Sequence, residues 1–515
     1  MTALKLLFAL LLAALVLAGL IGCDDIPQDY DRPVSRAATE TDTTYLADLS
    51  RRLGNPDDGR SGFYLLPDGL EALAARLVLA ERAEKTIDAQ YYLVHDDVAG
   101  HVFAWELLKA ADRGVRVRLL IDDMDTSGYD AMTAALDSHP NIEIRLFNPF
   151  WRQRGRALNA LFDFQRINRR MHNKSMTFDN QITIVGGRNI GAEYFSANDE
   201  SNYDDLDVFG AGPVAREISA AFDDYWNSEY AVPASVVIGP ADADAVAGGA
   251  RRTLEGLVAQ AAETGYGQAL TDEFRSRMKA GRLSLAWTPW KVIADPPEKA
   301  AGDLDNLPIV ASQMRPYLLN ATRDLFVSSA YFVPRAGGEA FLTGLQDKGV
   351  QVSILTNSLD STDVVPVYGH YAKSRKALLD AGVELWELRP DRERQDRSLR
   401  QLGLSRSGLH TKAFAIDRRY LFIGSVNWDP RSVRINTEMG ILMDAPELTS
   451  RVVESYAKGL PARAYRLSLD DSGDITWTAQ REDGTTLRYL DEPRASGWSM
   501  FQARLFGLLP IAGQL

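Results

Sequence analysis

Two stretches of the chain show the same succession of hydrophobic patterns. Apolar residues recur at helical spacing in some segments and alternate with polar residues in others. The first stretch predicts a helix at 70–83, a strand at 86–93, a helix at 103–113 that ends at Gly114, and strands at 115–121 and 141–147. The second predicts a strand at 325–332, a helix at 341–348 before Gly349, and strands at 350–355 and 383–387. Alternating strands and helices predict two α/β units, each a mixed sheet flanked by helices.

Both stretches lead into the same spaced motif. Four residues separate its Lys from its Asp, and six separate that Asp from its Gly, in both copies. The first copy reads His172-x-Lys174, Asp179 and Gly186-Gly187-x-Asn189, and the second reads His410-x-Lys412, Asp417 and Gly424-Ser425-x-Asn427. A pattern this long, found twice, indicates an internal duplication. We expect the two units to be related by a pseudo-twofold axis.

The remaining segments divide the chain around the two repeats. The predicted divisions are a signal peptide at 1–22, a flexible tether at 23–60, the first repeat at 61–230, an inter-repeat segment at 231–308, the second repeat at 309–462, and a C-terminal hairpin and helix at 463–515. Within the inter-repeat segment, the Ala/Gly-rich residues 240–250 predict a flexible link. The hairpin turns at Asp483-Gly484. The spacing at 498–509 favours a helix that caps the fold over one that lies in a membrane interface.

The N-terminus carries a membrane signal. A continuous apolar run from Leu6 to Ile21 is short for a spanning helix and is typical of a signal peptide. It is followed by Cys23, the one cysteine of the chain, in Leu-Ile-Gly-Cys, which resembles a bacterial lipobox. That resemblance implies lipidation at Cys23, and Asp24 implies retention in the inner membrane, on its periplasmic face. The alternative is an uncleaved anchor. Either way the chain is held at a membrane.

The composition of the chain bears on the kinds of molecule that it can bind. The chain has 515 residues, enough for two cores, and a net charge of -13, which disfavours nucleic acid as a partner. One basic stretch departs from this balance: Asp163 is its one acidic residue beside Arg152, Arg154, Arg156, Arg166, Arg169 and Arg170. This stretch either brings anionic lipid headgroups to the site or is a solvated helix with a buried face.

The motif residues suit chemistry at a phosphodiester. Alternation along a strand places His and Lys of each His-x-Lys on one face. Two histidines and two lysines supply a nucleophile, an acid for the leaving group and positive charge for the phosphate oxygens, to which Asn189 and Asn427 can donate hydrogen bonds. No metal or other cofactor is then required. Asp122 and Asp123 imitate a metal-ligand pair, but they end a strand, where Asp is common.

Two carboxylates follow the motifs in matching register. Aligning the copies places Glu438 opposite Asp205, each before a segment that ends at a proline. A catalytic histidine needs a partner on its second ring nitrogen. We expect Glu438 to orient His410 and Asp205 to orient His172. The alternative is that both are surface carboxylates before a buried strand.

The paired motifs resemble those of the phospholipase D superfamily. Further strings, among them MHNKSMTFDNQ, GGRNIGAEYF, TNSLDSTDV and FIGSVNWDPRS, are similar to the C-type cardiolipin synthases. The chain departs from that branch at Ala192, where Asp is usual, and at Asp204-Asp205, where Arg-Asp is usual, which bears on donor recognition.

The resemblance implies a membrane phosphatidyltransferase that acts on phosphatidylglycerol and, as a further candidate, phosphatidylethanolamine. It also implies that His172 is the nucleophile, that His410 is the acid, and that Asp179 and Asp417 form structural salt bridges. The alternatives are a hydrolytic phospholipase D, which shares every catalytic residue, and a non-catalytic or nuclease-like scaffold, which the two intact motifs disfavour.

Overall fold

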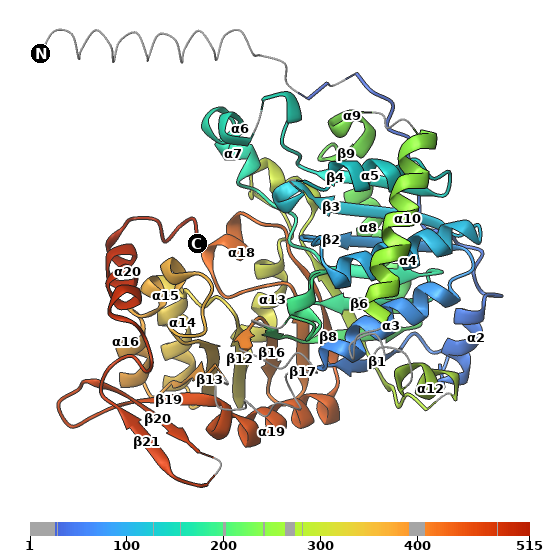
Figure 1. The fold of residues 1–515 in the computed structure, drawn as a ribbon. Coiled ribbons are helices and arrows are strands. Elements are labelled where there is room, and N and C mark those ends of the chain that lie inside the picture. Colours follow the sequence, from blue (N-terminus) through green and yellow to red (C-terminus); the bar gives the residue numbers. More distant parts are fainter. Residues whose placement is uncertain are drawn as a thin grey trace, which may run out of the picture.

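The computed structural model describes residues 26–515 except 28, 127, 155, 199–201, 240–242, 263–272, 281, 391–406 and 482. Two α/β units lie side by side (Figure 1). The first holds a nine-stranded sheet. Its strands, in spatial order, are β10 (Ala286–Thr288), β1 (Ser61–Leu66), β8 (Asp207–Ala211), β6 (Ile182–Gly186), β5 (Ser175–Phe178), β2 (Thr86–Tyr91), β3 (Arg116–Asp122), β4 (Ile142–Phe147) and β9 (Ala231–Pro233).

The second unit holds a ten-stranded sheet with the same central order. Its strands are β11 (Trp290–Ala294), β18 (Met439–Asp444), β17 (Tyr420–Gly424), β16 (Lys412–Ile416), β12 (Asp324–Ser329), β13 (Gln351–Asn357), β14 (Glu384–Leu388), β19 (Ala464–Leu469), β20 (Ile475–Gln480) and β21 (Thr486–Tyr489). In both sheets three parallel strands adjoin a set of antiparallel ones, and the motif strand β5 or β16 is the first strand of the antiparallel set. The prediction of two mixed sheets in tandem is confirmed.

Helices cover the sheets. In the first half they are α2 (Tyr45–Arg52), α3 (Gly69–Arg82), α4 (Val98–Asp112), α5 (Asp130–Asp137), α6 (Arg156–Phe162), α7 (Phe164–Ile167), α8 (Pro213–Trp226), α9 (Ala234–Ile238), α10 (Ala243–Ala262) and α12 (Glu273–Lys279). In the second half they are α13 (Val310–Leu319), α14 (Arg335–Asp347), α15 (Val365–Tyr371), α16 (Arg375–Asp380), α18 (Pro430–Arg434), α19 (Pro446–Arg463) and α20 (Gly497–Leu508). Short 3₁₀ turns lie at Asp123–Asp125, Arg152–Arg154, Ala192–Tyr194 and Pro297–Ala301.

Local sequence explains the main elements. β2 is buried throughout, and its Ile87, Ala89 and Tyr91 belong to the first core. The predicted helix at 103–113 begins earlier, at Val98, because the Asp97 carboxylate accepts hydrogen bonds from the N–H groups of Ala99 and Gly100 and caps the first turn.

A shared core joins the two units. Val185 and Val208 of the first sheet belong to one buried cluster with Ile423 and Ile441 of the second. A single connection also serves both sheets: β10 pairs with β1, and after Pro289 the chain continues as β11, which pairs with β18. The two units are therefore fixed to each other through both side chains and backbone.

Two linker predictions were wrong. The residues from 243 onward in the predicted flexible link form α10, whose Leu254 is buried; alanine is a strong helix former, and α10 packs on α4 and α5. The expected tether is ordered over its described part. α2 buries Leu46 and Leu49, and the N–H of Ala37 donates to Asp223 at 2.9 Å. Apolar residues among the polar ones explain this packing.

The apolar run at 6–21 and Cys23 lie outside the described residues. Within the described part, no helix combines the length and apolarity that crossing a bilayer requires. At the C-terminus the predicted hairpin is the β20–β21 pair, with Gly484 in its turn, and the predicted helix is α20.

Candidate active site

The two motifs meet where the units join. The N–H of His172 donates to the carbonyl of Thr437, and the N–H of His410 donates to the carbonyl of Asp204, both at 2.9 Å. A short parallel ladder, β7 (Asn202–Asp204) with β15 (Ser407–Leu409), supports the second contact. Each catalytic candidate is thus held by the backbone of the other repeat.

The histidine partners are exchanged between the repeats. His172 Nδ1 lies 2.8 Å from Glu438 Oε2, and His410 Nδ1 lies 2.6 Å from Asp205 Oδ2. The assignment of Glu438 to His410 and Asp205 to His172 was therefore wrong. The backbone contacts supply the reason: they place residue 438 beside His172 and residue 205 beside His410. Both carboxylates are fully buried, which also excludes the surface alternative.

The motif residues Gly187 and Ser425 shape the space around these carboxylates. A Cβ at position 187 would lie 2.3 Å from Asp205 Oδ1, so glycine alone leaves room for that carboxylate. At the equivalent position in the second repeat, the Ser425 hydroxyl donates to Glu438 Oε2. The Ser425 carbonyl also lies 3.1 Å from His172 Nδ1. Gly187 leaves room for the carboxylate of its own repeat, and Ser425 donates a hydrogen bond to the carboxylate of its own repeat. Each of these carboxylates binds the histidine of the other repeat.

The lysines add charge to the same buried space. Lys174 Nζ donates to the carbonyl of His172 at 2.7 Å, and Lys412 Nζ donates to the carbonyl of His410. Burial, followed by the charges of Lys174 and Lys412, lowers the pKa of His172 to about 4, although Glu438 opposes the shift. Burial and the same two lysines lower the pKa of His410 well below its ordinary value. Because both lysines act on both imidazoles, the four side chains form one electrostatic cluster.

The pKa values of the two carboxylates are shifted in opposite directions. Burial raises the pKa of Asp205. Burial also acts to raise the pKa of Glu438, but His172, Lys174 and Ser425 outweigh it and hold that pKa below its ordinary value. A neutral His172 that donates Nδ1–H to an ionised Glu438 keeps its Nε2 lone pair for a substrate. The two halves of the site are therefore chemically unequal.

The motif asparagines and several tyrosines line the histidines. Asn427 Oδ1 accepts the N–H of Tyr331, which leaves its amide N–H₂ for a ligand. Asn189 Nδ2 donates to the Tyr194 hydroxyl at 2.9 Å. Tyr194 in turn packs edge-on against His410, with ring centroids 5.0 Å apart. These contacts tie both asparagines to the walls of the site.

Sequence reasoning missed the tyrosines. Tyr92 packs edge-on against His172 at 5.1 Å between ring centroids, and Lys174 lies over its ring. Tyr203 lies 5.2 Å from the His410 ring. One signal was available: Tyr92 lies near the end of the strand predicted at 86–93, and functional residues often lie where strands end and loops begin. Nothing comparable marks Tyr203.

Asp179 and Asp417 bind backbone. Asp179 accepts hydrogen bonds from the N–H groups of Glu84, Lys85 and Thr86, directly before β2. Asp417 accepts the equivalent bonds from residues 322–324, before β12. The contacts are thus to main-chain amides, where the resemblance implied salt bridges. They fix each motif strand to its neighbour.

Much of the basic stretch is engaged within the protein. Arg152 pairs with Asp123 and Asp130, Arg166 with Asp163, and the buried Arg170 with Asp122. Asp122 also accepts the N–H of Met171, next to His172. Asp122 and Asp123 therefore hold arginines and backbone. Arg169 donates to the carbonyl of Arg434, and the interpretation that this stretch binds lipid headgroups stays a prediction.

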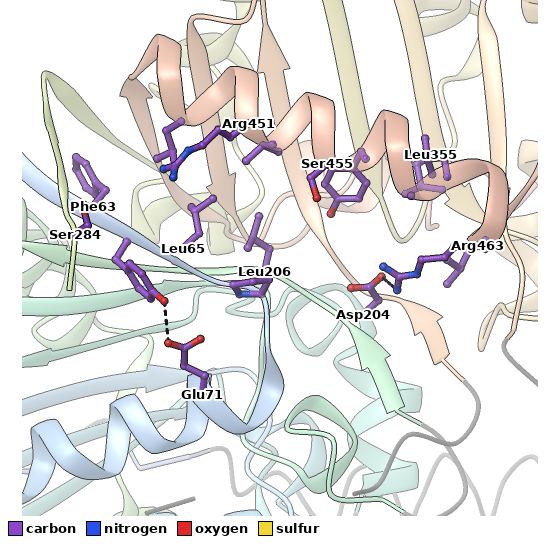
Figure 2. A pocket seen from close by; sticks show the side chains of 18 residues that line it. Phe63, Leu65, Glu71, Asp204, Leu206, Ser284, Leu355, Arg451, Ser455 and Arg463 are labelled. Atoms are coloured by element: carbon purple, nitrogen blue, oxygen red, sulfur yellow. Dashed lines mark hydrogen bonds and ion pairs between the residues drawn. The ribbon is translucent and has the colours of Figure 1, made fainter. Parts of the chain in front are cut away.

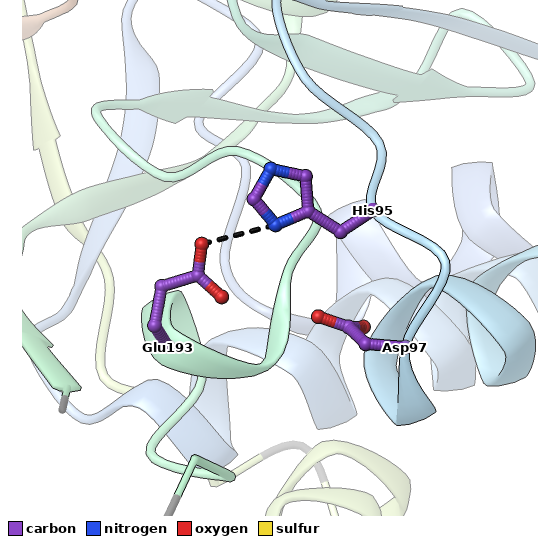
Figure 3. Close-up of side chains that lie close together, drawn as sticks. All are labelled: His95, Asp97 and Glu193. Atoms are coloured by element: carbon purple, nitrogen blue, oxygen red, sulfur yellow. Dashed lines mark ion pairs between the residues drawn. The ribbon is translucent and has the colours of Figure 1, made fainter. Parts of the chain in front are cut away.

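A cluster of polar side chains includes the neighbour of Tyr194, the residue that packs against His410. His95, Asp97 and Glu193 offer ligand atoms within 4.8 Å of one another (Figure 3). The oxygens of Asp97 already accept the N–H groups of α4 and of Ala192, and His95 Nδ1 lies 3.1 Å from Glu193. These bonds account for the cluster as a brace for the loop that carries Asn189 and Tyr194.

A cleft of ≈ 460 Å³ lies between the repeats, with apolar walls that include Leu65, Leu206 and Leu355. Figure 2 shows α19 along one side and Asp204 facing Arg463 at one end. Arg463 donates to Asp204 at 2.5 Å. Because Asp204 directly precedes Asp205 and accepts the N–H of His410, this ion pair anchors the strand behind the second histidine.

Two tandem α/β repeats with a His-x-Lys pair from each, gathered into one buried site, define a phospholipase D-like fold. Comparison with family models agrees: the model described as "Cardiolipin synthase, PLD-like domain" matches residues 78–226 and 314–458. The chain belongs to this family and is a phospholipase D-type, cardiolipin synthase-like enzyme.

Individual proteins support the assignment. The chain is 39% identical to cardiolipin synthase C of Escherichia coli K12 over 90% of this chain and 98% of that protein. It is 25% identical to cardiolipin synthase A of Pseudomonas putida over 80% and 70% of the two chains. Phosphatidylserine synthase of Haemophilus influenzae shares the fold, with a TM-score of 0.55 and 14% identity over 82% of this chain and 92% of that one.

Proposed function

We propose that the protein forms cardiolipin by transferring a phosphatidyl group to phosphatidylglycerol through a phosphohistidine intermediate. The observation that carries this proposal is the exchanged pair of histidine–carboxylate contacts around two shared lysines. The similarity to cardiolipin synthase C over nearly the whole chain supports the lipid substrates.

In the first half-reaction, His172 Nε2 attacks phosphorus. The bond from phosphorus to the headgroup oxygen of the donor lipid breaks, and His410 gives its proton to that oxygen. Glu438 accepts the Nδ1–H of His172 and stabilises the positive charge that develops on the ring. Lys174 and Lys412 offset the negative charge that grows on the phosphate oxygens.

In the second half-reaction, a glycerol hydroxyl of phosphatidylglycerol attacks the same phosphorus. His410 accepts the hydroxyl proton, the bond from phosphorus to Nε2 breaks, and His172 is regenerated. Burial, followed by the charges of Lys412 and Lys174, lowers the pKa of His410 well below its ordinary value. A bound phosphodiester brings the compensating negative charge, which raises that pKa and allows His410 to carry a proton.

The proposed location is the periplasmic face of the bacterial inner membrane, with the chain anchored by acyl groups on Cys23. The apolar run ahead of Cys23 and the Leu-Ile-Gly-Cys ending support this. Residues 26–60 pack along the first repeat, so an anchor at Cys23 places the enzyme directly at the lipid surface.

The test is to trap the intermediate. A phosphatidyl ester of nitrophenol carries a good leaving group and needs little protonation, so His410→Ala should still acquire label, mapped to His172. His172→Ala should acquire none, and both variants should lose overall transfer by several orders of magnitude. Label at His410 would reverse the roles, and no adduct under conditions that preserve phosphohistidine would favour direct transfer between lipids.

The acceptor is tested separately. Labelled phosphatidylglycerol, with and without phosphatidylethanolamine, is incubated with the full chain, and the lipids are analysed by mass spectrometry. Cardiolipin as the main product supports the transferase. Phosphatidic acid as the main product would mean that water is the acceptor and that the protein is a hydrolytic phospholipase D.

A further inference from the structure

Large apolar side chains gather on one flank of the molecule. Over the described residues, twelve are exposed, and eight of them lie in two segments. These eight, which we call the apolar surface, are Leu161, Phe162 and Phe164 of α6 and α7, and Trp498, Phe501, Leu505, Leu508 and Leu509 of α20 and its end. Leu508 is 81% exposed and Trp498 is 66% exposed. Clustering of this kind marks an interaction site.

α20 is built to present its large residues outward. It packs on α15 through its small residues: Ala503 and Gly507 are buried, and the Ala503 carbonyl would lie 2.3 Å from a Cβ at Gly369. Helices of soluble domains ordinarily bury their large apolar residues. Here that arrangement is inverted, and the Trp498 and Phe501 rings stack on the outside with centroids 5.5 Å apart.

The two segments of the apolar surface are connected. Asn168, at the end of α7, donates to the Gln514 side chain at 2.8 Å, and Arg431 donates to the carbonyls of Asn168 and Gln514. Figure 1 shows the chain end leaving α20 and reaching α18, and its hydrogen bond with Asn168 connects it to the end of α7. Asn168 precedes His172 by four residues, so this contact ties the chain end to the segment that leads to the site.

The nearby carboxylates are paired: Glu492 with Arg375 in the groove, and Asp163 with Arg166 beside α7. Exposed cations also lie beside the apolar surface, although the net charge of the protein is -13. Arg504 is the one charged side chain of α20, and it is exposed, as is Lys373 next to it across the α15–α20 groove. Exposed aromatic and leucine side chains flanked by cations are the composition of a surface that seats in the headgroup region of an anionic bilayer.

We infer that the apolar surface docks on an anionic phospholipid bilayer, with α20 lying in the interface, and so presents the membrane to His172. The inference rests on the proposed function for the identity of the substrate. It assigns to α20 more than the capping role that its sequence favoured: one face caps α15, and the other enters the lipid.

The first test measures contact directly. The full chain is placed in vesicles of phosphatidylglycerol and phosphatidylethanolamine whose acyl chains carry bromine, which quenches nearby tryptophan. The brominated lipid should quench part of the tryptophan fluorescence of the wild type, and Trp498→Phe should lack this quenching. Trp290→Phe, at the junction of the sheets, is the control and should retain it. Equal quenching in wild type and Trp498→Phe would overturn the inference.

The second test separates docking from chemistry. The triple variant Trp498→Gln/Phe501→Gln/Leu505→Gln should raise KM for vesicle lipid by about tenfold or more, because burying each large side chain contributes substantially. Turnover of a soluble short-chain phospholipid should stay within about twofold of wild type. Leu490→Gln, at a side chain that is 71% exposed on the hairpin, is the matched control and should change neither.

The outcomes distinguish the inference from the proposed function. If wild type processes neither vesicle nor soluble lipid, the proposed function fails, while the quenching test still decides the docking. If the triple variant matches wild type on vesicles, the docking inference fails. If wild type is a dimer that the triple variant dissociates without loss of vesicle activity, the apolar surface binds a second copy of the chain, and the inference is overturned.

Discussion

Glu438 binds His172 across the junction of the two repeats, 2.8 Å from Nδ1, although 266 positions separate the residues in the sequence. The Asp205–His410 contact mirrors it. Neither repeat therefore contains a complete histidine–carboxylate pair. The duplication can operate only as a joined structure, and the shared core that joins the units is part of the catalytic design.

The exchanged pairing predicts which step each carboxylate affects. Glu438→Gln removes the charge that stabilises the imidazolium of His172, so labelling of His172 by the nitrophenyl ester should slow by about 100-fold or more. Asp205→Asn should leave this labelling nearly intact and slow the acceptor step. Rapid-quench measurement of the adduct separates the two. If Asp205→Asn slows the labelling of His172 more than Glu438→Gln does, the pairing is contradicted.

The low pKa of His172 predicts a visible pH response. With a pKa of about 4 in the folded enzyme against an ordinary 6.5, the ring stays neutral at pH 5. The unfolded chain takes up this proton first, so this group's contribution to stability is full above pH 6.5 and is lost as the pH falls toward 4, by about 3 kcal/mol at most.

Histidine-selective ¹⁵N spectra of the free enzyme measure this, with His172→Asn assigning the resonance. The charge of Glu438 raises the pKa of His172, so Glu438→Gln should lower it further. A His172 resonance that titrates near 6.5 would show that the imidazole is not desolvated in this way.

A side chain added at Gly187 should disturb the half of the site that holds Asp205 and His410. Gly187→Ala places a methyl group against Asp205 Oδ1 and must displace the carboxylate from His410, so transfer should fall by about 100-fold or more while the fold persists. Gly344→Ala, where nothing lies within 4 Å of the added Cβ, is the matched control. Transfer assays and circular dichroism of both variants decide the matter, and full activity in Gly187→Ala would refute it.

Replacing Asp179 should lower the stability of the fold. Asp179→Ala leaves the buried N–H of Thr86 and the part-buried N–H groups of Glu84 and Lys85 without an acceptor at the start of β2, which should lower the free energy of unfolding by about 1–3 kcal/mol. Asp417→Ala should cost less, because the residues it binds are more exposed to water. Denaturant titration compares them, with the exposed Asp471→Ala as control. A larger loss in Asp417→Ala would contradict this account.

Replacing Cys23 tests whether the N-terminus is cleaved and lipidated. Cys23→Ala should abolish lipidation and leave a larger, unprocessed precursor, because no thiol remains to carry the acyl groups. Metabolic labelling with a fatty acid and mass measurement of the isolated chain provide the readout. Cleavage and acylation of the variant as in wild type would exclude the lipobox.

The sequence was sufficient to predict the repeating α/β pattern, the central strands and the motif residues. These depend on local periodicity and on fixed spacing, which the duplication presents twice. It also predicted the β20–β21 hairpin and α20, whose turn chemistry and helical spacing are local.

Which carboxylate binds which histidine depends on how the two repeats pack against each other. Alignment of the copies found Glu438 and Asp205, but it paired each within its own repeat, because register carries no information on contacts between repeats. The same holds for Tyr203 against His410 and for the strands at 286–294 that join the sheets. These arrangements arise when the two units bury their shared core, and that burial brings together residues hundreds of positions apart.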